Sequence, residues 1–179
     1  IARQQYNLLG SHDTPRFLTQ VRGNAAHNHL AVVLLFTYPG VPSVYYGDEI
    51  GLQGEGGNGA RGCMPWDRTI WDEDLRGRYQ ALIKLRRSNP ALVEGGFQML
   101  LAEADTLVFL RDAEAEQILV VAQRGPGTRS SEPIDVAHGG LPDGLVLCEL
   151  FSGRRATVSG GRLEIGAVPP GAQVWVSIG

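Results

Sequence analysis

The chain has 179 residues, of which 43% are hydrophobic, and its 16 basic and 19 acidic side chains leave a formal net charge of −3. This composition is typical of a globular protein with one ordinary core or two small ones, and it argues against long disordered segments. Because the charge is near neutral and no run of Lys or Arg occurs, we expect neither nucleic acid nor a membrane as a partner.

The first part of the chain alternates short apolar segments with helical patterns. Residues 6–10 predict a buried strand that ends in a loop. Asn24 is a suitable N-cap for a helix over residues 25–38, and its apolar stretch 30–36 predicts burial on nearly every side. That stretch is also the longest apolar run of the sequence, and it is far too short to span a bilayer.

A second buried strand is predicted over residues 41–46. The glycine-rich segment 47–67 has no periodicity and predicts a long loop, which inside a domain usually carries a function. A helix capped by Asp72 or Asp74 then runs to about residue 88.

Two successive βα units imply a parallel sheet, and parallel strands need cover on both faces. Two strands cannot achieve this alone, so the pattern best fits the last two units of an eight-stranded (β/α)8 barrel. The first residue is Ile1, and the methionines are Met64 and Met99, so we expect a piece of a longer protein. Its uncovered apolar faces predict self-association or a retained upstream piece. The cellular compartment stays open.

From residue 95 onward the chain reads as short strands separated by turns rich in Gly and Pro. The predicted strands cover residues 97–103, 106–111, 116–123, 133–136, 145–150, 162–165 and 173–178. Short strands at this regular spacing predict an antiparallel β-sandwich. We therefore divide the chain into α/β residues 1–94 and all-β residues 95–179.

Two segments are candidate sites, because catalytic groups in βα folds gather at the carboxyl ends of strands. GSHDTPR (residues 10–16) follows the first strand, and YGDEIG (residues 46–51) follows the second. His12 and Asp13 together offer an imidazole donor beside a carboxylate that can stabilise positive charge. The alternative is a turn or helix-capping aspartate with a bystander histidine.

The other polar and aromatic residues near these segments also have two interpretations. Asp48 and Glu49 either belong to a site or contact backbone and an arginine. Arg16 is either a site residue or the solvated partner of the neighbouring carboxylate. Trp66 and Trp71 either stack on a sugar ring or pack in the core.

Four segments together resemble the α-amylase family of glycoside hydrolases. LLGSHDTPRF (residues 8–17) resembles the family's fourth short motif, at the end of the seventh barrel strand. PGVPSVYYGDEIGL (residues 39–52) is similar to its eighth strand and following loop. CMPWDR (residues 63–68) resembles its MPWD segment, and LRRSNPAL (residues 85–92) resembles the link into its C-terminal sandwich. Within the family, the SHDTPR form resembles cyclomaltodextrinases, neopullulanases and maltogenic amylases.

The resemblance implies a role for three residues. Asp13 matches the third catalytic carboxylate, which fixes the distorted sugar ring and stabilises the oxocarbenium-like transition state. His12 matches a histidine that hydrogen-bonds sugar hydroxyls where the bond breaks. Arg16 is a candidate for electrostatic support or substrate contact. The implied substrate is an α-glucan, a maltooligosaccharide or a cyclodextrin, and no catalytic role is implied for Asp48 or Glu49.

Retaining hydrolysis needs a nucleophilic carboxylate and a carboxylic acid about 5 to 5.5 Å apart. The family carries these two groups after its fourth and fifth strands, which lie upstream of this sequence. We therefore expect the longer protein to hydrolyse α-glucosidic bonds and this chain alone to be inactive. We predict no metal ion and no cofactor within the chain, because the oxygen ligands of residues 48–58 lack a recognised metal-binding spacing.

Two other functions stay open. One is a glucosyl transferase or isomerase of the same fold, and the other is a noncatalytic carbohydrate-binding module built on the sandwich. A binding module would need a planar row of exposed aromatic residues. From residue 95 onward the aromatic residues are Phe97, Phe109, Phe151 and Trp175, mostly within apolar strand patterns.

Overall fold

The computed structural model describes residues 4–114 and 116–178. The chain divides into two compact units, Ile1–Leu85 and Arg86–Gly179. This boundary lies before residue 94, where the sequence places it, because the short helix α4 (Pro90–Val93) packs against the second unit's strands β4 (Thr106–Ala113) and β5 (Glu116–Gln123).

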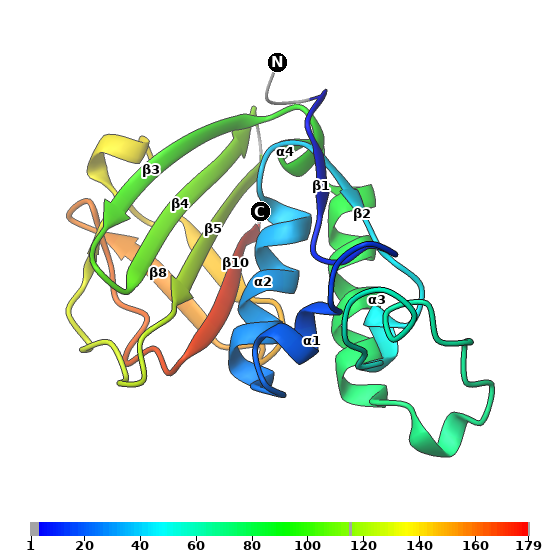
Figure 1. The fold of residues 1–179 in the computed structure, drawn as a ribbon. Coiled ribbons are helices and arrows are strands. Elements are labelled where there is room, and N and C mark those ends of the chain that lie inside the picture. Colours follow the sequence, from blue (N-terminus) through cyan, green and yellow to red (C-terminus); the bar gives the residue numbers. More distant parts are fainter. Residues whose placement is uncertain (1–3, 115, 179) are drawn as a thin grey trace. The chain divides into compact units, whose positions relative to one another are not determined.

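The first unit is built around two parallel strands. β1 (Tyr6–Leu8) pairs with β2 (Val41–Ser43), and the helix α2 (Ala25–Thr37) connects them (Figure 1). The side chain of Asn24 accepts a hydrogen bond from the backbone N–H of His27, so the predicted cap is confirmed. A short helix that the sequence did not predict, α1 (Phe17–Gln20), precedes α2.

Helix α2 is buried on most sides, as its apolar sequence predicts. Its buried residues include Ala31, Val32, Val33, Leu35 and Phe36. The remaining side of α2, which carries Leu30 and Leu34, borders a hollow of about 420 Å³ beside β1. Within the described part of the chain, no helix combines the length and the apolar character needed to cross a membrane.

The turn between α2 and β2 is fastened to β1. Asn7 donates from Nδ2 to the carbonyl oxygen of Pro39 at 3.0 Å, and the N–H of Val41 donates to the carbonyl oxygen of Gln5 at 2.7 Å. Gly40 has a φ of +127°, and a Cβ there would lie 2.6 Å from Asn7 Nδ2. Only glycine fits such a turn without strain, and the turn sets the two strands in register.

After β2 the chain makes a long excursion before the helix α3 (Glu73–Ser88). The excursion contains two single-turn helices, η2 (Asp48–Ile50) and η3 (Arg68–Ile70). Of the two predicted caps for α3, Asp72 is the one observed, since its Oδ1 accepts a hydrogen bond from the N–H of Leu75 at 2.9 Å. The buried side of α3 carries Leu75, Tyr79, Leu82 and Leu85.

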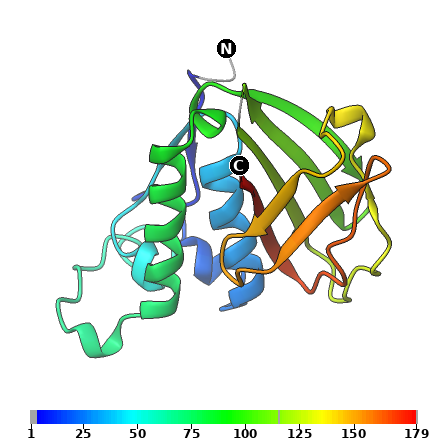
Figure 2. The ribbon, with the colours of Figure 1, turned by 180° about the vertical axis from the view of Figure 1, so that it is seen from behind.

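The second unit is a single antiparallel sheet of eight strands. The strands follow the order β3-β4-β5-β10-β7-β8-β9-β6. They form the two layers of the predicted sandwich, and β7 and β8 lie across the green strands β3, β4 and β5 (Figure 2). The remaining strand bounds are β3 (Gly96–Ala102), β6 (Ile134–Asp135), β7 (Val146–Glu149), β8 (Arg155–Ser159), β9 (Arg162–Leu163) and β10 (Gly171–Ile178).

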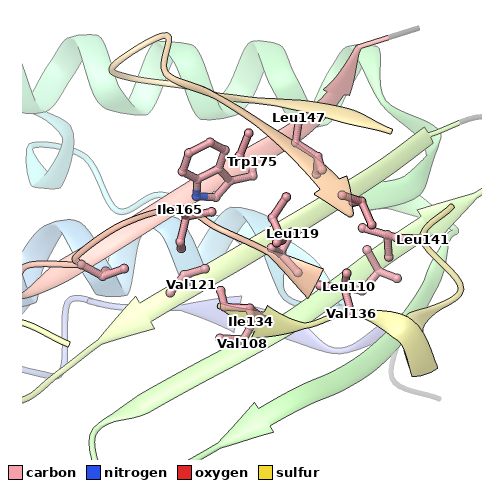
Figure 3. Packing of buried hydrophobic residues seen from close by; sticks show 14 residues of the cluster. Val108, Leu110, Leu119, Val121, Ile134, Val136, Leu141, Leu147, Ile165 and Trp175 are labelled. Carbon is pink, nitrogen blue, oxygen red and sulfur yellow. The ribbon is translucent and has the colours of Figure 1, made fainter. Parts of the chain in front are cut away.

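The two layers enclose one hydrophobic core. Trp175 is 1% exposed and lies among aliphatic side chains from both layers (Figure 3). Strand β8 was not predicted, because its segment resembles a turn. Its inward residues, Ala156 and Val158, alternate with exposed polar residues. Core residues shown in Figure 3 include Val108, Leu110, Leu119, Val121, Leu147 and Ile165.

The aromatic residues of this unit do not form an exposed row. Phe109 and Trp175 are buried, and Phe97 and Phe151 are half-buried. The rings of Phe97 and Phe109 pack 5.2 Å apart. The described residues of the second unit therefore offer no exposed aromatic platform of the kind that a carbohydrate-binding module uses.

Candidate functional site

The two candidate segments lie at the same edge of the β1–β2 pair. Because the strands are parallel, their carboxyl ends point the same way. Residues 10–16 leave β1 at this edge, and residues 46–51 follow β2.

His12 and Asp13 lie together in the turn after β1. His12 Nε2 is 3.2 Å from Asp13 Oδ2, and the two side chains are 63% and 69% exposed. The turn is shaped by Ser11, whose Oγ accepts a hydrogen bond from the N–H of Asp13 and whose N–H donates to Thr14 Oγ1. Asp13 does not cap a helix, because the N-cap of α1 is Arg16. The carboxylate is thus held in a turn and remains open to solvent.

Arg61 joins this pair from the long loop after β2. Its Nη2 lies 3.2 Å from Asp13 Oδ1, and its Nε donates to the carbonyl oxygen of His12 at 3.1 Å. No sequence motif pointed to Arg61. The available signal was that it is the only basic residue in segment 47–67, but 48 residues separate it from Asp13.

Arg16 is fully buried, with 0% of its side chain exposed. Its Nη1 donates to Asp48 Oδ1 at 2.9 Å and to the carbonyl oxygen of Tyr46 at 2.7 Å. Its guanidinium carbon lies 4.7 Å from the ring centroid of Tyr45 and 4.8 Å from that of Tyr46. Arg16 therefore pairs with Asp48, and the expected solvated pair with Asp13 is wrong. With no exposed surface, its side chain does not reach a ligand directly, so the expected substrate contact is not supported.

The family model of the α-amylase catalytic domain matches residues 1–91, just over half of the chain. The chain belongs to the α-amylase family.

Individual relatives and structures agree with this family. The chain is 42% identical over 137 residues to a cyclomaltodextrinase of Bacillus sp, covering 75% of this chain and 25% of that protein. It is 32% identical over 177 residues to neopullulanase 2 of Thermoactinomyces vulgaris, covering 97% and 30%. It superposes on an Anoxybacillus α-amylase with a TM-score of 0.86 at 28% identity, covering 98% of this chain and 38% of that one.

The chain thus spans only about a quarter to two fifths of the length of these α-amylase family proteins. Its first unit is the last part of the family's (β/α)8 barrel, and its second unit is the antiparallel sandwich that follows. The fold class expected from the sequence is confirmed.

Asp48 is the titrating group of the buried pair. Burial raises the pKa of its carboxyl to about 6, with the charge of Glu49 adding to the rise and the hydrogen bond and charge of Arg16 opposing it. Burial, together with the charges of Asp48 and Glu49, also raises the pKa of Tyr79 far above its usual range. At neutral pH, Asp48 is therefore mostly ionised and paired, and it takes up a proton as the pH falls below about 6.

This shift predicts a pH-dependent contribution to stability. Because the pKa of Asp48 is higher in the folded chain than in the unfolded one, the protonated carboxyl favours folding. This gain in the free energy of unfolding is fully present below about pH 4 and is lost as the pH rises through about 6. We expect the stability of the wild-type chain, relative to that of Asp48→Asn, to fall between pH 4 and pH 7 in urea unfolding. Asp74→Asn, at an exposed carboxylate on α3, should keep the wild-type dependence. If the free energies of unfolding of wild type and Asp48→Asn change in parallel with pH, folding does not shift the pKa of Asp48.

The two tryptophans of the long segment have different environments. Trp66 is 79% exposed, so it is not a core residue. The indole Nε1 of Trp71 donates to the carbonyl oxygen of Pro65, and the guanidinium groups of Arg68 and Arg76 lie 5.1 and 5.6 Å from the Trp71 ring centroid. Trp71 is half-buried and packs against the two arginines. Both tryptophans border a pocket of about 530 Å³ that is also lined by Tyr46, Glu49, Met64 and Arg76.

Among the described residues, neither a group of metal ligands nor a thiol is part of the site. Over residues 4–114 and 116–178, no three His, Cys, Asp or Glu side chains are grouped so as to hold a metal ion. Cys63 and Cys148 are free thiols.

Proposed function

We propose that this chain is the C-terminal part of a retaining α-glycoside hydrolase that cleaves α-glucosidic bonds in maltooligosaccharides, cyclodextrins or related α-glucans, and that Asp13 is its third catalytic carboxylate. The observation that carries the proposal is the exposed Asp13 carboxylate at the strand end, flanked by His12 and Arg61. Membership of the α-amylase family and the names of the relatives support the substrate class.

The geometry suits a carboxylate that acts on developing positive charge. Cleavage of a glycosidic bond passes through an oxocarbenium-like transition state. A carboxylate already oriented before the reaction stabilises that charge without a reorganisation cost. Each oxygen of Asp13 has one basic partner, with Arg61 on Oδ1 and His12 on Oδ2, so the group is oriented before a sugar arrives.

His12 has a second task in this proposal. One ring nitrogen, Nε2, lies against Asp13, which leaves Nδ1 for a sugar hydroxyl. Arg16 acts behind the site as electrostatic support, since its guanidinium is buried against Asp48 and the backbone of Tyr46.

The nucleophile and the general acid belong, in this proposal, to the preceding part of the longer protein. The exposed apolar side chains of the first unit, including Tyr6, Leu8, Tyr38 and Val41, are the surface that the rest of the barrel covers. When the chain is isolated, the same surface makes it self-associate or retain an upstream piece.

The test is product analysis with the full-length protein. Incubation with maltoheptaose, a cyclodextrin or pullulan is expected to release shorter maltooligosaccharides, and proton NMR at early times is expected to show the α-anomer first. The β-anomer first would exclude a retaining mechanism. Isomers or longer chains without new reducing ends would indicate a transferase or isomerase, and no reaction on any of these glucans would contradict the proposed function.

A further inference from the structure

Arg16 connects the turn that carries Asp13 with two later segments of the first unit. Its side chain bonds Asp48 and the carbonyl oxygen of Tyr46, in the turn after β2. Its backbone N–H donates to the carbonyl oxygen of Gly54 at 2.9 Å, at the start of the loop that carries Arg61. Because Arg16 ends the turn of residues 10–16, one residue ties the Asp13 turn to both neighbouring segments.

A second bond holds the same junction. The N–H of Gly54 donates to Thr19 Oγ1 at 2.8 Å. The loop that delivers Arg61 to Asp13 is therefore attached at its base to the helix α1, which follows the Asp13 turn directly.

The buried pair is costly, and its surroundings satisfy it only in part, since Arg16 Nε and Nη2 are buried without a hydrogen-bond partner among the described residues. The side chains of Arg16 and Asp48 are 0% and 9% exposed, and removing two charges from water costs several kcal/mol per ion before pairing. The rings of Tyr45 and Tyr46 offset part of this cost by cation–π attraction. A buried pair of this kind adds little net stability compared with apolar side chains of similar volume, so stability alone does not account for it.

Two glycines leave space for the pair. A Cβ at Gly10 would lie 2.9 Å from Asp48 Oδ2, so a side chain at that position would collide with the carboxylate. A Cβ at Gly47 would lie 2.8 Å from Leu52 Cδ2 and 3.3 Å from Arg16 Nη1, and Gly47 has a φ of +84°. The turn after β1 therefore leaves space for Asp48 at Gly10, whereas Gly47 is required by its positive φ and by Leu52 as well as by Arg16.

We infer that Asp48, acting through Arg16, is a positioning residue that sets the Asp13 carboxylate in its working geometry. The inference rests on the proposed function, in which Asp13 is catalytic. It assigns Asp48 a task that does not involve contact with the sugar. Since displacements of about 1 Å can cost about a hundredfold in rate, loss of the pair should appear mainly in kcat.

A double-mutant cycle in the full-length protein tests this inference. With 4-nitrophenyl α-maltoside, Asp48→Asn is expected to lower kcat by about 10- to 100-fold and to change KM by less than about threefold. In an Asp13→Asn background, the same substitution should lower kcat by less than about twofold, because the group that it positions is already gone. Arg16→Lys should retain more activity than Arg16→Met, since a lysine keeps the positive charge that pairs with Asp48.

The outcomes separate the two claims. If the wild-type protein hydrolyses the substrate but the losses from Asp13→Asn and Asp48→Asn multiply, Asp48 has a general structural role and the inference is overturned. An inactive wild-type protein overturns the proposed function and, with it, the inference. Circular dichroism verifies that each variant is folded. If Asp48→Asn does not fold, Arg16→Met takes its place in the cycle with the same criterion.

Discussion

Replacing Asp13 by Asn in the full-length protein is expected to lower kcat for maltoheptaose hydrolysis by about 10³- to 10⁴-fold. The physical reason is the loss of a negative charge that faces the oxocarbenium-like transition state, while the shape of the side chain is kept. Because the charge acts mainly on the transition state, KM should change far less than kcat. Initial rates of reducing-sugar release, measured over a range of substrate concentrations, provide both constants.

The matched control for this variant is Asp74→Asn. Asp74 is an exposed carboxylate in the first turn of α3, and the same chemical change there should leave kcat within about twofold of wild type. An Asp13→Asn protein that is folded and retains more than a tenth of the wild-type kcat would exclude Asp13 from the catalytic centre.

The 179-residue chain by itself is expected to release no sugar from any α-glucan. Retaining hydrolysis needs two further carboxyl groups about 5 to 5.5 Å apart around the scissile bond. In the part of the chain that the structure describes, the side-chain partners of Asp13 are His12 and Arg61, both basic. One carboxylate between two bases can stabilise positive charge, but within the described ranges it has no carboxyl partner with which to form the acid and nucleophile pair.

The measurement compares the purified chain with the same chain carrying Asp13→Asn. Light scattering first gives the mass of the chain in solution, because self-association or a retained upstream piece is expected from its exposed apolar surface. Sugar release that is equal in both preparations is contamination. Release that scales with wild-type chain concentration and disappears in the Asp13→Asn chain would show that the chain is a complete catalyst.

Local patterns predicted the elements of the first unit, but its two strands are shorter than predicted and are not buried, since Tyr6, Leu8 and Val41 are exposed. The apolar helix with Asn24 at its N-terminus, the two parallel strands and the helix beginning after Asp72 all depend on residues within a few positions of one another. The motif around His12 and Asp13 was recognisable for the same reason, since its characteristic residues are contiguous. The short helices α1 and α4 were missed because their segments are too short to show a period.

The sequence by itself thus determined the family resemblance, the order of the elements and the candidate carboxylate. Only the tertiary structure decided that Arg16 is buried against Asp48, 32 residues away, and that Arg61 reaches Asp13 across 48 residues. It also decided that Trp66 is exposed. Such partners are chosen by how two loops pack at the common edge of parallel strands, and that packing leaves no periodic trace along the chain.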